Sequence, residues 1–284
     1  MRLPFHLRFA FNPMIRINSD RMKNISGVNQ LQREVPIIVS LTSYEERFDD
    51  LELSLYSILN QDLKPDRIIL WLSNDLDLTK IPYSITKYVK NGLEIRFVKD
   101  IGSYTKIIYA LKEFNSSIIV TADDDIIYPK DWLKKLYMSY ISHPEDIQAH
   151  RAHRVKIENN VILPYRKWEK HIETEGAEYT NFLTGVGGVL YPPNCFRKEV
   201  LREDIFLKNA PFADDIWLWV MALLSNKKIR VVKNHIDTLC VTNILRHLQK
   251  KDNRLYYVNI NKNDKQLENL IKLYKQNVFN KLLS

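Results

Sequence analysis

The sequence predicts an α/β protein whose mostly parallel sheet is flanked by helices. A continuous apolar run, typical of a strand buried on both faces, occurs at residues 36–41; further strands are expected at 67–72 and 93–98, and a fourth apolar strand ends in three aspartates at 123–125. Segments with apolar residues at helical spacing lie between several of these runs. Strands that alternate with helices form right-handed βαβ units, so we expect the strands to run parallel.

The individual helices follow from local patterns. The first is expected at 49–59, where two acids occupy the first turn and four apolar residues share one face, Leu51, Leu55, Ile58 and Leu59. The second is expected at 106–114, with Ile107, Ala110, Leu111 and Phe114 facing inward. From Asn261 onward, Leu267, Leu270, Ile271, Tyr274 and Val278 have the spacing of an amphipathic helix. Packing on the domain is the first expectation for this tail, with a second chain or a membrane as alternatives.

Composition narrows the class. With 284 residues, 45% of them hydrophobic, the chain is long enough to bury a full core. No run approaches the roughly 18 apolar residues of a membrane span, so we expect a soluble or peripheral protein. The two cysteines, Cys195 and Cys240, are too few for a structural zinc site, and no disulfide framework is expected. A reducing cytoplasm fits this composition.

The formal net charge of +8 favours an anionic partner. Basic residues are spread along the chain without a nucleic-acid-binding motif, so nucleic acid is not expected. Residues 1–11 mix basic and bulky apolar side chains, as a segment on an anionic membrane surface would. A loosely packed N-terminal arm explains the same pattern equally well.

Asp123, Asp124 and Asp125 follow the fourth strand directly. Adjacent carboxylates repel, and a divalent cation with hard oxygen ligands relieves that repulsion. Side chains alternate along a strand, so Asp123 and Asp125 are expected to converge on one divalent cation. The alternative is a solvated acidic turn before a helix that starts near Trp132, with Asp131 as its cap. The position at the carboxyl edge of a parallel sheet, where ligands gather, favours the functional interpretation.

A second acidic pair, Asp214 and Asp215, opens an apolar helix. Acids at a helix N-terminus are stabilised by the dipole and by capping, which is the structural alternative. Combined with a carboxylate and metal site on the sheet, the pair becomes a candidate general base, and the helix dipole is expected to keep it ionised.

The segments between the two acidic motifs are less regular. Residues 147–180 are polar, basic and aromatic, which suits strands or loops that bind a ligand. Gly185, Gly187 and Gly188 do not match a dinucleotide-binding pattern, because a strand and Pro-Pro follow them. These glycines allow either the close approach of a ligand or a tight structural turn, and both interpretations stay open.

The ordered set of motifs resembles the nucleotide-sugar-dependent glycosyltransferases of the GT-A (Rossmann-like) fold. The set comprises Val39-Ser40-Leu41-Thr42-Ser43 on the first strand, the strand-end Asp-Asp-Asp, the Gly-Gly segment and the Asp-Asp that opens a helix. It is similar in style to bacterial family 2 enzymes of cell-surface polysaccharide and lipopolysaccharide synthesis. The resemblance covers roughly residues 36–235.

The resemblance implies roles for particular residues. Asp123 and Asp124 would hold ribose and metal, Asp125 the metal most directly, and Asp215 would be the base, with Asp214 sharing or taking that role. The remaining nucleotide-sugar site would comprise Thr42, Ser43, Arg47, Asp75, Asp100, Lys106, Gly187 and Gly188. Trp217 would either stack on a sugar or lie in the core. His235 and His247 are available as a late metal ligand, but neither has a matching spacing.

The resemblance thus implies an inverting transferase that depends on Mn²⁺ or Mg²⁺, with a UDP-sugar as the favoured donor and a glycan or lipid-linked acceptor. It would be cytoplasmic, or peripheral on the inner face of the plasma membrane. The expected organisation is an N-terminal arm (1–35), a catalytic domain (36–240, with nucleotide-sugar and acceptor halves at 36–130 and 131–240) and a helical extension (241–284). A nucleotidyltransferase is the alternative enzyme, although 41–47 lacks the glycine of its usual signature. A non-catalytic carbohydrate-binding protein is the third hypothesis.

Overall fold

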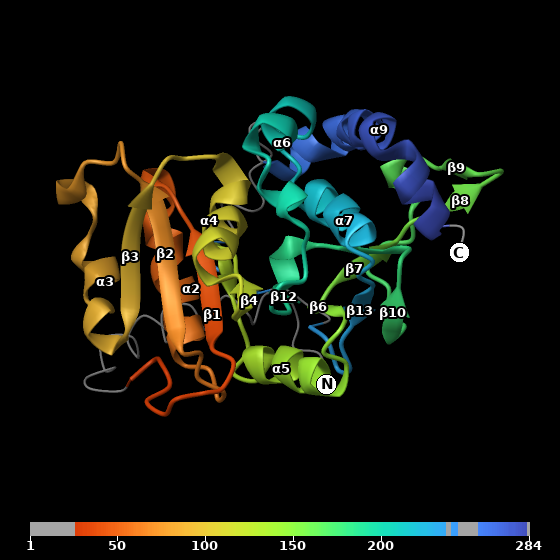
Figure 1. The fold of residues 1–284 in the computed structure, drawn as a ribbon. Coiled ribbons are helices and arrows are strands. Elements are labelled where there is room, and N and C mark those ends of the chain that lie inside the picture. The colour runs from red at the N-terminus through yellow and green to blue at the C-terminus, as the bar shows by residue number, and fades with distance from the viewer. Residues whose placement is uncertain (1–25, 237–239, 244–254, 283–284) are drawn as a thin grey trace.

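The fold is built on one eight-stranded sheet in a computed structural model that describes residues 26–236, 240–243 and 255–282. The strand order is β10-β13-β6-β12-β4-β1-β2-β3 (Figure 1). Helices cover both faces of this sheet, so the predicted α/β class with a large, mainly parallel sheet is confirmed.

The parallel part of the sheet contains the strands that the sequence predicted. β1 (Ile37–Thr42) pairs in parallel with β2 (Arg67–Ser73) and with β4 (Ile118–Thr121), and β2 pairs in parallel with β3 (Leu93–Val98). The apolar residues of β1, β2 and β4 are buried because helices lie on both faces, whereas the edge strand β3 is only partly buried and its Phe97 is 40% exposed. The carboxyl ends of these four strands therefore meet at one edge, which we call the carboxyl edge.

The other part of the sheet is mixed. β12 (Val189–Tyr191) runs antiparallel to both β4 and β6 (Ile147–Ala149), and β6 runs parallel to β13 (Ile229–Val231), which is antiparallel to β10 (Gly176–Glu178). Since β4 and β6 share a direction, the residues after β6 also lie at the carboxyl edge. Three short pairs complete the strands: β7 (Ala152–Arg154) with β11 (Asn181–Leu183), β8 (Ile157–Glu158) with β9 (Val161–Ile162), and β5 (Ile126–Ile127) with β14 (Cys240–Val241).

The helices divide between the two faces of the sheet. α2 (Phe48–Leu59), α3 (Tyr83–Thr86) and α5 (Trp132–Ser142) pack in one apolar cluster with Val39 and Leu41 of β1. α4 (Thr105–Phe114), α6 (Glu203–Asn209) and α7 (Asp214–Leu224) contribute to a second cluster with the opposite face. This division follows from the alternation of β1, whose Ile38 points away from Val39 and Leu41.

Helix α7 is a core helix. Trp217 is fully buried, and its indole Nε1 donates to the carbonyl of Val200 at 3.0 Å. The expectation that Trp217 stacks on a sugar is therefore wrong, and its alternative, a core position, holds.

The C-terminal tail forms α9 (Leu255–Leu282), which is interrupted at Tyr274, where φ is −116° and ψ is 19°. Leu270 and Val278 are fully buried in the cluster that contains α7, and Figure 1 shows the two helices side by side. The tail thus packs on the domain, as its periodicity predicts.

Four other expectations concern membrane spans, the thiols, the N-terminal segment and a late histidine. None of the helices in the described ranges has the length and apolar content needed to cross a membrane. Cys195 and Cys240 form no disulfide. The segment 1–11, with its expected membrane contact, and His247 lie outside the described residues.

Candidate active site

The three consecutive aspartates lie in a turn at the carboxyl edge. β4 ends at Thr121, and β5 begins at Ile126, so Asp123, Asp124 and Asp125 connect the two strands. The backbone N–H of Asp123 donates to the Tyr128 hydroxyl at 2.8 Å, which fixes the start of the turn.

Arg47 gathers two of the three carboxylates. Its Nη1 donates to Asp124 Oδ1 at 3.0 Å and to Asp125 Oδ2 at 2.6 Å. Ser43 Oγ donates to the second oxygen of Asp124 at 2.6 Å. Burial raises the pKa of Asp124 to about 7, although the Arg47 guanidinium opposes that rise. We call Ser43, Arg47, Asp124 and Asp125 the Arg47 cluster.

This arrangement differs from the one that strand alternation predicts. Asp125 shares its partner with Asp124 rather than with Asp123, because the strand has already ended at Thr121. The expected convergence of Asp123 with Asp125 is therefore corrected: Asp125 converges with Asp124 on Arg47. Their assignment as metal ligands stays a prediction.

Lys106, at the start of α4, joins the aspartate turn to the second acidic pair. Its Nζ donates to Asp123 Oδ1 at 2.6 Å and lies 3.8 Å from Asp214 Oδ2. The Lys106 residue is only 8% exposed. Burial alone would lower the pKa of Lys106, but Asp123 and Asp214 outweigh it, and the net direction is upward. The ammonium is therefore charged and holds the two acidic motifs together.

The acids that open α7 do not cap their own helix. Asp214 Oδ1 accepts a hydrogen bond from Ser103 Oγ at 2.7 Å, and Asp215 Oδ1 accepts from the backbone N–H of Gly185 at 3.0 Å. Both side chains thus reach across to other elements, whereas a capping acid would bond to N–H groups of its own first turn. We call Lys106, Asp123, Asp214 and Asp215 the Lys106 cluster.

Asp215 has the more perturbed carboxyl group. Burial and then the neighbouring Asp214 raise its pKa well above the ordinary value, while Lys106 opposes them. The sequence expectation is that the helix dipole keeps this group ionised; in the structure, burial and a like charge act in the opposite direction. A raised pKa suits a group that must take up a proton during a reaction.

The glycine segment forms one 3₁₀ turn, Gly185–Gly187, before β12. The carbonyl of Gly187 accepts from the Trp132 indole at 2.9 Å. Gly188 has φ of 88°, and a Cβ there would lie 2.5 Å from Trp132 Nε1. Trp132 therefore explains Gly188 structurally, and the Gly185 N–H is the part of the turn that faces Asp215.

Besides Gly187 and Gly188, three predicted residues lie outside both clusters. Thr42 Oγ1 donates to the Trp71 carbonyl at 2.9 Å, and Asp100 accepts from the N–H of Gly102 at 2.8 Å. Asp75 is exposed after β2. Their nucleotide contacts stay predictions.

The donor set of the aspartate turn fits a hard divalent cation. Two carboxylate oxygens, from Asp124 and Asp125, converge on one nitrogen of Arg47, so a cation held by both oxygens would take the place of that guanidinium nitrogen. Asp123 faces Lys106 instead. Mn²⁺ or Mg²⁺ would therefore be held mainly by Asp125 and Asp124.

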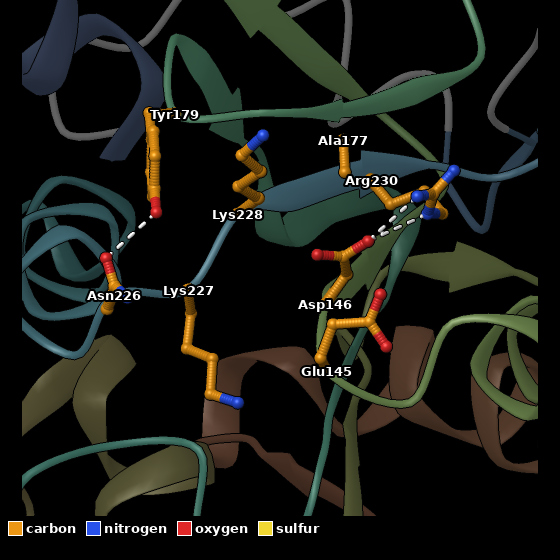
Figure 2. A pocket seen from close by; sticks show the side chains of 8 residues that line it. All are labelled: Glu145, Asp146, Ala177, Tyr179, Asn226, Lys227, Lys228 and Arg230. Carbon is orange, nitrogen blue, oxygen red and sulfur yellow. Dashed lines mark hydrogen bonds and ion pairs between the residues drawn. The ribbon is translucent and has the colours of Figure 1, made fainter. Parts of the chain in front are cut away.

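In the described ranges, a different group of residues could hold a metal ion, because one ligand atom from each lies within 4.8 Å of the others. These residues are His143, Glu145 and Asp146. Asp146 is already ion-paired with Arg230 at 2.9 Å. The pair lines a pocket of about 330 Å³ together with Tyr179 and Lys228. Figure 2 shows these side chains from close by. Because Asp146 precedes β6, the pocket lies at the edge opposite the aspartates, and we assign it no part in the site.

Two contacts could not be read from the sequence. Ser103 holds Asp214, and the only signal was its position between Asp100 and Lys106. The N–H of Thr242 donates to the Asp125 carbonyl at 2.9 Å, beside the β5–β14 pair. The chain beyond residue 240 therefore returns to the aspartate turn, although the predicted domain boundary lies there.

The family is decided by the sequence profile of glycosyl transferase family 2, which matches residues 38–204, more than half of the chain. The chain belongs to this family. The family 2 match includes the Arg47 cluster, Lys106 and Gly185, and it ends before Asp214 and Asp215. The assignment of Asp214 and Asp215 to the site therefore rests on their geometry and not on the family match.

Solved structures resemble this family 2 chain at low identity. Mannosyltransferase PcManGT from Pyrobaculum calidifontis, in complex with GDP-Man and Mn²⁺, is 18% identical with a TM-score of 0.34, over 50% of this chain and 44% of its own. S. aureus TarS 1-349 in complex with UDP-GlcNAc is 17% identical with a TM-score of 0.47, over 71% and 57%. The inositol-1-phosphate CTP transferase from T. maritima is 15% identical with a TM-score of 0.40, over 73% and 91%. The chain thus spans about half the length of the first two proteins. No curated protein matches it in sequence.

Proposed function

We propose that this protein is a metal-dependent glycosyltransferase that moves a sugar from a nucleotide-diphosphate donor to a glycan or lipid-linked acceptor with inversion. The observation that carries the proposal is the Lys106 bridge, which brings the aspartate turn and the Asp214-Asp215 pair to one place at the carboxyl edge. Membership of family 2 supports the reaction class. A UDP-sugar is the favoured donor.

The two acidic clusters would divide the chemistry between them. Asp125 and Asp124 would hold Mn²⁺ or Mg²⁺, which when bound supplies a Lewis acid for the diphosphate of the donor. Ser43, Thr42, Asp75 and Asp100 would line the nucleotide side.

Asp215 would remove the proton from the acceptor hydroxyl as that oxygen attacks the anomeric carbon. Its carboxylate is oriented by the Gly185 N–H, and its raised pKa favours proton uptake. In a single displacement the new bond forms on the face opposite the departing diphosphate, which gives inversion. Asp214, held by Ser103 and close to Lys106, would position this end of α7.

The proposed setting is the cytoplasm, or the inner face of a bacterial plasma membrane, in the synthesis of surface polysaccharide or lipopolysaccharide. The basic composition supports contact with anionic lipid. A nucleotidyltransferase uses similar acids and metal, but the Leu41–Arg47 segment contains no glycine for the usual phosphate-binding loop.

The test is a panel of nucleotide sugars, with and without Mn²⁺, measured for transfer and for slow hydrolysis. We expect one donor to be consumed only with the metal, and Asp125→Ala to lose that activity. Ser103→Ala, which loosens only Asp214, should keep the donor preference. Full activity of Asp125→Ala, or no reaction with any donor, would overturn the proposal. If the affinity for nucleotide changes neither with Mn²⁺ nor in Asp215→Asn, the result would instead support a carbohydrate-binding protein without turnover.

A further inference from the structure

Arg151 follows β6 at the carboxyl edge, beside the glycine turn that binds Asp215. Its stem passes close to Gly187, where an added Cβ would lie 2.9 Å from Arg151 Cγ and 3.2 Å from Cδ. Gly187 ends the same 3₁₀ turn whose first N–H, that of Gly185, donates to Asp215. One 3₁₀ turn spans about 6 Å, so the stem of Arg151 lies against the turn that orients the candidate base.

The guanidinium of Arg151 is held by an imidazole. Its Nη2 lies 2.5 Å from His171 Nδ1 and 3.1 Å from Nε2. His171 has a left-handed backbone with φ of 54°, and its N–H donates to His153 Nδ1 at 3.1 Å. A left-handed backbone costs a residue other than glycine about 1–2 kcal/mol, so the surrounding contacts must offset this conformational cost at His171.

The charge of Arg151 is not balanced within the described part of the chain. There, Arg151 forms no ion pair with a carboxylate, in contrast to Arg47, Arg67 and Arg230; Arg154 on β7 likewise forms none and bonds to Thr180 instead. Burial, and then Arg151 and Lys170, lower the pKa of His171, so its imidazole is neutral near pH 7. The site thus presents a positive group beside a neutral imidazole, with Lys170 adding positive charge to the same ring, and an external anion would balance this charge.

We propose that Arg151, positioned by His171, binds an anionic oxygen group, phosphate or carboxylate, on the acceptor. This inference rests on the proposed transfer reaction and names the class of acceptor that it would take. The acceptor is favoured over the donor because β6 is separated from β4 by β12, on the side away from β1, which precedes Ser43 and Arg47. Arg151 would therefore select charged acceptors while Asp215, between the two sides, removes the proton.

The experiment measures binding without turnover, by calorimetry on the full chain. The probes are glucose 6-phosphate and glucuronic acid, with neutral glucose as their control. The variants are Arg151→Gln and, as a matched control, Arg154→Gln on β7, whose Nη1 donates to Thr180 Oγ1 at 3.3 Å. We expect at least one anionic sugar to bind about tenfold more tightly than glucose, and that gain to vanish in Arg151→Gln only.

A second titration, with UDP and Mn²⁺ already present, separates the acceptor from the donor diphosphate. The proposal predicts unchanged binding of the anionic sugar. Displacement by UDP, equal affinity in Arg151→Gln, or no preference for the charged sugars would overturn it. Thermal midpoints of both variants check that they are folded. Because no transfer is measured, this inference fails or holds separately from the proposed enzyme activity.

Discussion

Lys106 is the single side chain on which the geometry of the site depends most. It is nearly buried, and it neutralises carboxylates from two motifs that are about ninety residues apart in the sequence. Removing one partner of a buried ion pair leaves the other charges without compensation, which is far costlier than losing a surface pair.

We therefore expect Lys106→Met to lower the free energy of unfolding by about 3 kcal/mol. Lys99→Met, which removes an exposed pair with Glu203, should change it little. Urea denaturation of both variants checks the contrast. Equal shifts would show that the Lys106 cluster contributes no more than a surface contact.

A second prediction at the residue scale concerns His150. This side chain is fully buried, its Nε2 donates to the Trp132 carbonyl at 3.0 Å, and burial lowers its pKa to about 4. A lowered histidine pKa means that the unfolded chain binds the proton more readily, so stability falls as the pH drops below about 6.5. Between pH 7 and pH 5 this group should cost about 2 kcal/mol.

Denaturant midpoints of the wild type and His150→Gln at pH 7 and pH 5 measure this loss. The variant should lose less stability over the interval. His153, with a pKa lowered to about 3, contributes in the same direction and remains in both proteins. An identical pH dependence in the two proteins would contradict the role of His150.

At the scale of elements, the turn before β12 places the Gly185 N–H by fitting closely against α5. Gly188 has positive φ and faces the Trp132 ring at a distance that no Cβ tolerates. Gly102 offers a matched control, because its φ is also positive, at 66°, yet an added Cβ would meet nothing within 4 Å.

Gly102→Ala should cost about 1 kcal/mol for the backbone alone. Gly188→Ala should cost about 1–3 kcal/mol more, because Trp132 must move, and it should also lower transfer by displacing the turn that orients Asp215. Equal thermal midpoints for the two variants would show that Trp132 yields without penalty.

At the scale of the whole molecule, α9 supports the helix that carries the candidate base. Leu270 is fully buried against the cluster that contains α7, whereas Leu273 is 54% exposed on the same helix. We expect Leu270→Ala to lower the free energy of unfolding by about 2–5 kcal/mol and Leu273→Ala to leave it nearly unchanged. Chemical denaturation followed by tryptophan fluorescence would report both.

The sequence predicts the strands and helices of this molecule better than the side-chain contacts of its candidate site. The strands at 67–72 and 93–98 match β2 and β3 within a residue, because apolar and alternating patterns over such lengths are strong local signals for strands. The turn at Asp123–Asp125 was less predictable, since alternation holds only while a strand lasts. The bonds of Asp214 to Ser103 and of Asp215 to Gly185 join distant segments, so no local pattern encodes them.

The central claim is that the aspartate turn binds the donor while Asp215 acts on the acceptor. The most direct test is calorimetry of UDP with Mn²⁺ on the wild type, Asp125→Asn and Asp215→Asn, with transfer rates measured on the same samples. The account predicts that Asp125→Asn loses metal-dependent UDP binding, while Asp215→Asn binds UDP normally and transfers about 10²–10⁴ times more slowly. Normal transfer by Asp215→Asn, or UDP binding that is indifferent to Asp125, would contradict it.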